Sequence, residues 1–183
     1  MRGVTAMQIQ EARGEDFAEL RTFYIRMNEV INVRNNDYDP DNAVFPPDDM
    51  IQRAISRGEQ YVGIEDGIIV SACIVSSECE DAYRTAKWKA SAGEDDFRVI
   101  HALRVAPEYE GRGFAKQMLS FVIAHAAERG LKALRLDVLE DYWVDKLYYP
   151  FGFQHVDTVE ILYEDIGHPK RFKLLEKELL PQG

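Results

Sequence analysis

The sequence predicts an α/β fold: a mixed, mostly antiparallel central sheet of about seven strands, flanked by about four helices. Runs with strand and helix periods follow one another in the order β-α-α-β-β-β-α-β-α-β-β. Residues 60–76 have the pattern of a β-hairpin, and residues 97–130 that of a strand–turn–helix crossover. A length of 183 residues without internal repeats is typical of one domain, spanning residues 1–183.

The first elements are a strand and two helices. We expect the strand over residues 5–12 and the first helix over 14–30, whose first turn carries two acidic side chains near the positive end of the helix dipole. Residues 35–42 are dense in turn formers and predict a loop. Residues 46–58 start with proline and aspartate and end with glycine, which is typical of a short helix.

A hairpin and a long polar segment follow. In residues 60–76, two β-rich runs flank Asp66 and Gly67, the strongest short signal for a hairpin turn. Residues 78–96 are polar and lack a clear period, so we expect a long loop or a partly helical insertion. Loops of this length in compact domains are often functional.

The second half of the chain contains the remaining strands and helices. We expect, in order, a strand over residues 97–105, a helix over 114–130, a strand over 131–139, a short helix over 141–149, and strands over 156–164 and 170–179. Pro150 should stop the short helix, because its ring clashes with a continuing helical backbone.

Composition excludes several classes of protein. The net charge of −10 argues against a nucleic-acid partner; it suits a cationic substrate, although an acidic solvated surface is the commoner cause. No apolar run approaches the roughly 20 residues of a membrane helix, and the first residues lack a secretory signal pattern. Cys73 and Cys79 have no CxxC or Cys/His partner pattern, so we expect reduced thiols in a cytoplasmic protein and no metal site.

Two glycines, Gly111 and Gly113, lie in the turn between the central strand and its helix. Glycine suits a bare structural turn, but backbone N–H groups at a helix start can also hold a phosphate. The dinucleotide pattern GxGxxG fails, since Lys116 stands at its third glycine, and the closing GK[ST] of a phosphate-binding P-loop is absent. The turn alone favours the structural reading.

A second motif, farther along the chain, changes the interpretation of this turn. The turn reads Glu110-Gly111-Arg112-Gly113-Phe114-Ala115, and downstream the chain has Asp141-Tyr142-Trp143-Val144-Asp145-Lys146-Leu147-Tyr148, then Gly152-Phe153. Together with the element order, these motifs resemble the GNAT superfamily of acyl-CoA-dependent N-acyltransferases over essentially the whole chain. Glu110 stands where the family usually has glutamine or arginine, and Asp141 where it often has asparagine. Either carboxylate could weaken CoA binding if it points inward.

The resemblance implies a sheet splayed around an acyl-CoA site, with acetyl-CoA as the acyl donor and no metal. Backbone N–H groups of Arg112 to Lys116 would then face the pyrophosphate, and the strand backbone would pair with the pantetheine arm. One strand N–H would stabilise the oxyanion. The implied donor-binding residues are Leu103, Arg104, Val105, Glu110, Gly111, Arg112, Gly113, Phe114, Ala115, Lys116 and Asp141.

The resemblance also implies two catalytic residues. Tyr148 matches the general acid of the family, because a phenol stays protonated at neutral pH and can donate to a thiolate; Tyr149 is the alternative. His101 is the candidate base. Strict alternation places it on one strand face with the apolar residues 97, 99, 103 and 105, which a bulge would change. It is equally readable as a core histidine, and the alternative bases, acting through water, are Glu78, Glu80, Glu94 and Asp137.

The expected activity is direct transfer of an acetyl group to a primary amine of a small molecule or peptide, in a ternary complex. The family usually builds its acceptor pocket from the early and inserted segments, which here hold Tyr24, Met27, Tyr38, Tyr83, Trp88 and Phe97; these side chains could equally pin loops to the sheet. A catalytically silent acyl-CoA-binding or regulatory module and a binder of another nucleotide stay open as alternatives. A homodimer also stays open, since members of the family commonly dimerise.

Overall fold

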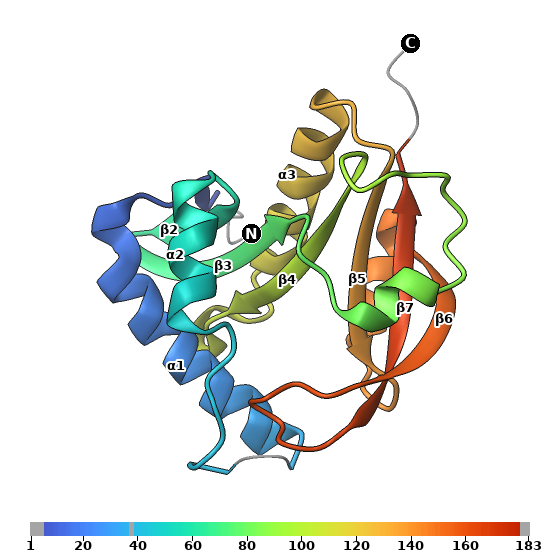
Figure 1. Ribbon diagram of the computed structural model, residues 1–183. Coiled ribbons are helices and arrows are strands. Elements are labelled where there is room, and N and C mark those ends of the chain that lie inside the picture. Colours follow the sequence, from blue (N-terminus) through green and yellow to red (C-terminus); the bar gives the residue numbers. More distant parts are fainter. Residues whose placement is uncertain (1–5, 37–38, 180–183) are drawn as a thin grey trace.

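The computed structural model describes residues 6–36 and 39–179. Within them one sheet has the strand order β1-β2-β3-β4-β5-β7-β6, and only the β4–β5 pair is parallel (Figure 1). The strands are β1 (Gln8–Glu11), β2 (Gln60–Glu65), β3 (Ile68–Ser76), β4 (Phe97–Val105), β5 (Ala133–Leu139), β6 (Gln154–Ile161) and β7 (Lys170–Glu178). The mixed, mostly antiparallel sheet is therefore confirmed.

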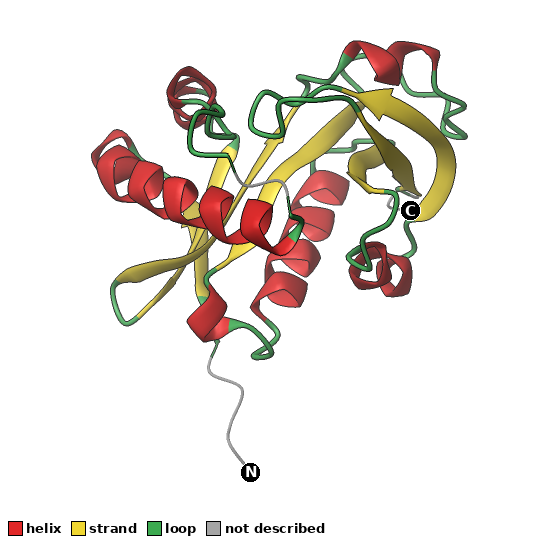
Figure 2. Ribbon diagram, turned by 90° about the horizontal axis from the view of Figure 1, so that it is seen from below, coloured by secondary structure: helices red, strands yellow, loops and turns green. Residues whose placement is uncertain are grey.

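Helices cover both faces of this sheet, as Figure 2 shows from below. They are α1 (Phe17–Arg34), α2 (Asp48–Ser56), α3 (Phe114–Glu128) and α4 (Asp145–Tyr148). Neighbouring residues of β2 separate the two cores: Tyr61 packs with buried residues of α3, whereas Val62 packs with those of α1. This alternation is the period-two pattern of a strand that is buried on both faces.

The hairpin that joins β2 to β3 has the predicted turn. Asp66 and Gly67 have φ values of 52° and 76°, so both central residues lie in the left-handed region that a two-residue hairpin loop of this class requires. The turn places Glu65 of β2 opposite Ile68 of β3, where the pairing of these two strands begins.

The predicted order of elements is confirmed, with shifted ends. The first helix begins after a 3₁₀ turn (Gly14–Asp16) and continues to Arg34, four residues beyond the prediction at Val30. The short helix starts only at Asp145 and ends at Tyr148, and Pro150 lies in a 3₁₀ turn directly after it. Residue 5 of the predicted first strand and residues 37–38 of the predicted loop lie outside the described residues.

The polar segment of residues 78–96 is a loop with one 3₁₀ turn (Asp81–Thr85). A buried ion pair fastens it to the sheet: Glu176 of β7 accepts a hydrogen bond from Arg135 of β5 at 2.9 Å. Glu176 also accepts from the backbone N–H groups of Lys89 and Ala90, at 2.7 and 3.0 Å. One carboxylate therefore joins the loop to two strands.

Candidate functional site

Strands β4 and β5 separate near the middle of the sheet. They pair only between residues 97–99 and 133–135, although β4 continues to Val105. The register between β3 and β4 shifts between Ala72 and Ile74, and Ala102 has a φ of 49°, which marks a bulge in β4. In the described part of the chain, the edge of β4 that faces β5 is therefore free of a strand partner after Val99.

A cavity of about 600 Å³ opens at this separation. One end is bordered by residues 100–105 of β4, by the turn before α3 and by Tyr148 of α4. The other end is bordered by the last turns of α1, by Phe45 and by residues 163–166. The two ends thus combine segments from the first, middle and last parts of the sequence.

The turn before α3 presents backbone donors to the cavity. Gly111 and Gly113 have φ values of 73° and 83°, and Gly113 caps the helix. The Gln117 N–H donates to the Gly113 carbonyl at 3.0 Å, so the N–H groups of residues 114–116 precede the hydrogen-bonded ladder of the helix. An added Cβ at either glycine would meet nothing within 4 Å, so the positive φ is what requires glycine here.

The charged side chains of the turn have partners on the protein. Arg112 is hydrogen-bonded to the buried Glu65 of β2, with its guanidinium over the rings of Tyr109 and Phe114. Glu110 forms an ion pair with Arg34 at the end of α1. Among the described residues that border the cavity are Glu110 and Lys116, but not Arg112.

Asp141 lies differently from its expected place in the donor site. It is exposed, on the loop between β5 and α4, and it does not border the cavity, whereas its neighbours Tyr142 and Trp143 do. Asp141 therefore does not place a carboxylate in the cavity, and the loop presents Tyr142 and Trp143 there instead.

Tyr148 and Tyr149 have different surroundings. Tyr148 is 7% exposed, packs edge-on against Phe153 at 5.7 Å and borders the cavity. Burial raises its pKa above the ordinary value for a phenol, so the hydroxyl stays protonated. Tyr149 is 41% exposed, donates to Asp145 at 3.1 Å and lies outside the cavity lining.

His101 borders the cavity, and one of its two ring nitrogens is hydrogen-bonded within the protein. Its Nε2 lies 2.9 Å from the backbone carbonyl oxygen of Glu78. A carbonyl only accepts, so Nε2 carries the proton in the neutral ring and Nδ1 holds the lone pair. Burial lowers the pKa of His101, which favours this neutral form.

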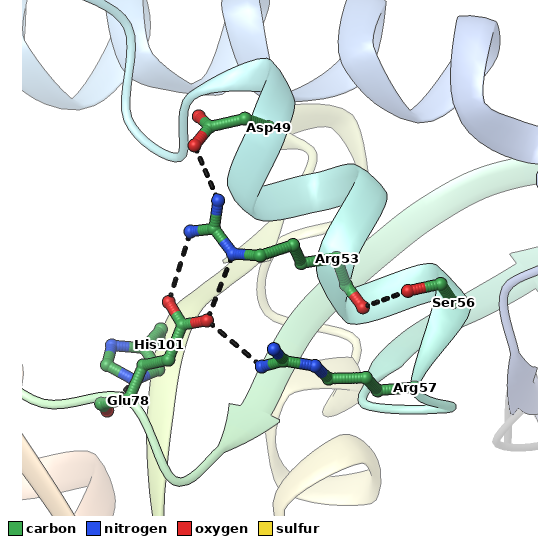
Figure 3. A network of polar contacts seen from close by, with 6 residues as sticks. All are labelled: Asp49, Arg53, Ser56, Arg57, Glu78 and His101. Atoms are coloured by element: carbon green, nitrogen blue, oxygen red, sulfur yellow. Dashed lines mark hydrogen bonds and ion pairs between the residues drawn. The ribbon is translucent and has the colours of Figure 1, made fainter.

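Two arginines hold the carboxylate of Glu78: Arg53 of α2 and Arg57, which directly follows that helix (Figure 3). Arg53 donates to both its oxygens, at 3.1 and 3.3 Å, and Arg57 to one of them at 3.2 Å. The hydrogen bonds from Arg53 lower the pKa of Glu78. The clamp therefore holds the backbone carbonyl that orients His101.

The predicted single-face alternation of β4 is wrong around His101. Phe97 and Val99 pack in the cluster beneath the loop of residues 78–96, whereas Leu103 and Val105 pack against the α3 cluster. The bulge at Ala102 places the second pair of residues on the other face of the sheet from the first pair, which is the change that the sequence analysis attributes to a bulge.

Among the four alternative carboxylates, Asp137 is the one that borders the cavity. The hydroxyls of Tyr83 and Tyr163 donate to its Oδ2 at 2.8 and 2.9 Å. Burial raises its pKa, and the two hydrogen bonds act in the opposite direction. Arg135, two positions before Asp137 on β5, is paired with Glu176.

Several cavity residues were missed by the sequence analysis. They share no motif and come from distant segments: Arg34, Phe45, Tyr163, Asp165, Ile166 and Phe172. Of the early and inserted aromatic or apolar candidates, Met27 borders the cavity, Tyr24 is buried against Gln60, and Tyr38 lies outside the described residues. No local signal marks the missed residues.

Two features are absent from the part of the chain that the structure describes. No group of three or more His, Cys, Asp or Glu side chains there could hold a metal ion. No helix there is long and apolar enough to cross a membrane.

Comparison with known proteins gives consistent results. The model of the acetyltransferase (GNAT) family matches residues 27–153. A curated relative, the ribosomal protein bS18-alanine N-acetyltransferase of Haemophilus influenzae, is 26% identical over 111 residues, which are 59% of this chain. The match spans 65% of the length of that relative.

Solved structures with the same fold come from several bacteria. An acetyltransferase of the GNAT family from Streptococcus agalactiae superposes with a TM-score of 0.74 at 21% identity, covering 96% of this chain and 97% of that one. A second, from Listeria monocytogenes, gives a TM-score of 0.70 at 18% identity, with 94% and 95% covered. At these identities the likeness concerns the fold.

Proposed function

This chain belongs to the GNAT acetyltransferase family, and from that premise we propose that it moves an acetyl group from acetyl-CoA to a primary amine. One observation carries the proposal: β4 leaves β5 after Val99, and the cavity between them ends at the glycine turn of α3. Such an opening offers a free strand edge and free helix N–H groups to one extended ligand.

The residues around the first end of the cavity fit an acyl-CoA. The N–H groups of residues 113–116 and the dipole of α3 suit a pyrophosphate, and Lys116 adds a positive charge at the same end. The backbone of Leu103, Arg104 and Val105 supplies the strand edge for the pantetheine arm. In this proposal the donor brings the activated acyl group, and the protein positions it.

The protein groups beside the thioester of the bound donor supply proton transfer. The attacking amine loses a proton to the lone pair on Nδ1 of His101, directly or through water. A backbone N–H of the free β4 edge donates to the carbonyl oxygen of the thioester as negative charge develops there. Tyr148 gives its phenol proton to the leaving sulfur as the carbon–sulfur bond breaks, and water restores the phenol.

The second end of the cavity is where we place the acceptor. Three rings border it in edge-to-face contact: Tyr163 lies 5.3 Å from Phe45 and 5.2 Å from Phe172, between ring centres. Asp137, beside Tyr163, provides the carboxylate that an incoming ammonium group prefers. The acceptor amine belongs to a small molecule or to a peptide, as in the relative whose name specifies an alanine of a ribosomal protein.

A matched pair of glycine variants tests the donor site. Gly113 borders the cavity, whereas Gly67 lies in the remote β2–β3 hairpin; their φ values are 83° and 76°, and an added Cβ at either meets nothing within 4 Å. Alanine should therefore strain both sites alike. Calorimetric titration of the Gly113→Ala variant should show acetyl-CoA affinity at least about tenfold weaker, while Gly67→Ala should bind like wild type.

Two outcomes contradict the donor site. The first is equal affinity in both glycine variants. The second is binding of ATP or NAD by the wild-type protein in preference to acetyl-CoA, which indicates the other kind of nucleotide binder.

A further inference from the structure

An ion pair joins the end of α1 to the turn at the donor end of the cavity. Arg34, the last residue of α1, donates to the two oxygens of Glu110 at 2.6 and 3.3 Å. Both residues border the cavity, and their side chains are 41% and 46% exposed. This two-pronged geometry is the strongest form of an arginine–carboxylate contact.

The position of Glu110 creates an electrostatic problem for a phosphate ligand. Its carboxylate is next to Gly111, the first glycine of the turn, and borders the same cavity. A bare carboxylate there repels a pyrophosphate, and the chain as a whole already carries a net charge of −10. Arg112 of the turn is bound to Glu65, and the cation that pairs with Glu110 comes from α1.

We propose that Arg34 is a binding residue of the donor site, which neutralises Glu110 so that the turn can accept the pyrophosphate of an acyl-CoA. This inference rests on the proposed function. It assigns a role in donor binding to the end of α1, which also borders the acceptor end of the cavity. The hydrogen bond from Arg34 and the raised pKa that it gives the guanidinium fit a permanently paired cation.

The same helix offers a matched control. Arg26 of α1 pairs with Glu108, two residues before Glu110. Their side chains are 52% and 57% exposed, and neither residue borders the cavity. Both ion pairs join α1 to the segment before α3, so a purely structural role would make them equivalent.

The test is a double-mutant cycle with two ligands. Affinities for acetyl-CoA and for S-acetylpantetheine, which lacks the pyrophosphate, are measured at low salt, where surface charges are screened least. The variants are Arg34→Met, Glu110→Gln, their combination, and Arg26→Met. Circular dichroism checks that each is folded; exposed pairs of this kind contribute about 0–1 kcal/mol to stability.

We expect Arg34→Met to weaken acetyl-CoA binding about tenfold, because Glu110 is then uncompensated. Glu110→Gln should bind at least as well as wild type, and the combined variant should recover wild-type affinity to within about twofold. Arg26→Met should change little, and S-acetylpantetheine should bind all variants alike.

Three results overturn the inference. They are an Arg34→Met variant that binds like Arg26→Met, a combined variant that fails to recover, and an equal loss for S-acetylpantetheine. If wild type does not bind acetyl-CoA at all, the proposed function falls along with the inference. If wild type binds and Arg34→Met shows no loss, the inference alone falls.

Discussion

The Tyr148→Phe substitution separates chemistry from binding most sharply. It removes one hydroxyl oxygen from a side chain that is 7% exposed and leaves the ring in its edge-on contact with Phe153. No hydrogen bond from this hydroxyl to a described residue is present, so we expect the free energy of unfolding to change by less than about 1 kcal/mol. In the proposed mechanism, the substitution removes the proton donor for the leaving sulfur.

The expected loss follows from the surroundings of that hydroxyl. A positioned general acid contributes about 10²–10⁴-fold in rate, which corresponds to about 2.7–5.4 kcal/mol in the transition state. Because Tyr148 is buried and borders the cavity, bulk water substitutes poorly for its hydroxyl as a proton donor. We therefore expect kcat to fall by at least about a hundredfold, while the Kd for acetyl-CoA stays within about twofold of wild type.

Tyr149→Phe is the matched control. It also removes one hydroxyl, but from a side chain that is 41% exposed, bound to Asp145 and outside the cavity lining. Thiol release is measured under saturating donor and acceptor, with affinity from calorimetry and stability from urea unfolding. Unchanged turnover in Tyr148→Phe, or an equal loss in Tyr149→Phe, would refute the general-acid role.

Three more predictions follow from buried and exposed groups. Burial lowers the pKa of His101, so protonation of this base should reduce the wild-type kcat/KM only below about pH 6.5. The His101→Gln variant should lack this acidic fall in kcat/KM, and a pH profile identical to that of wild type would contradict the role of His101 as the base. Glu176→Leu leaves Arg135 buried without its ion-pair partner and should cost about 3–5 kcal/mol in urea unfolding, whereas a cost below about 1 kcal/mol contradicts the pairing. In a Trp88→Phe variant, Trp143 is the one remaining tryptophan of two, is 63% exposed and borders the cavity, so acetyl-CoA should change its emission; unchanged emission at saturation is the contrary result.

Local signals account for the parts of the fold that the sequence predicts. The Asp66–Gly67 turn requires positive φ at both residues, and Asp-Gly is one of the few dipeptides that favour this backbone conformation. The central turn and Tyr148 were found through two motifs at a family spacing, and both border the cavity.

Other parts of the site depend on contacts that no local pattern encodes. Strict alternation fails between Val99 and Leu103 because of the bulge at Ala102, whose position no alternating pattern of residues reveals. Arg34 meets Glu110 across 76 positions of sequence, and Tyr163 meets Asp137 across 26. Such partners are fixed by packing of the whole sheet. For the same reason the motif position of Asp141 did not reveal that this residue lies outside the cavity lining.

The most direct test of the central claim is release of the CoA thiol from acetyl-CoA by the wild-type protein, across a panel of primary amines. The panel contains small monoamines, polyamines, lysine peptides and peptides with free amino termini, and mass spectrometry follows the amine. We expect thiol release above the rate of hydrolysis with at least one class, a mass increase of one acetyl group on that amine, and loss of both in Tyr148→Phe. Saturable binding of acetyl-CoA without thiol release for any class would contradict acetyl transfer and indicate a catalytically silent acyl-CoA-binding module.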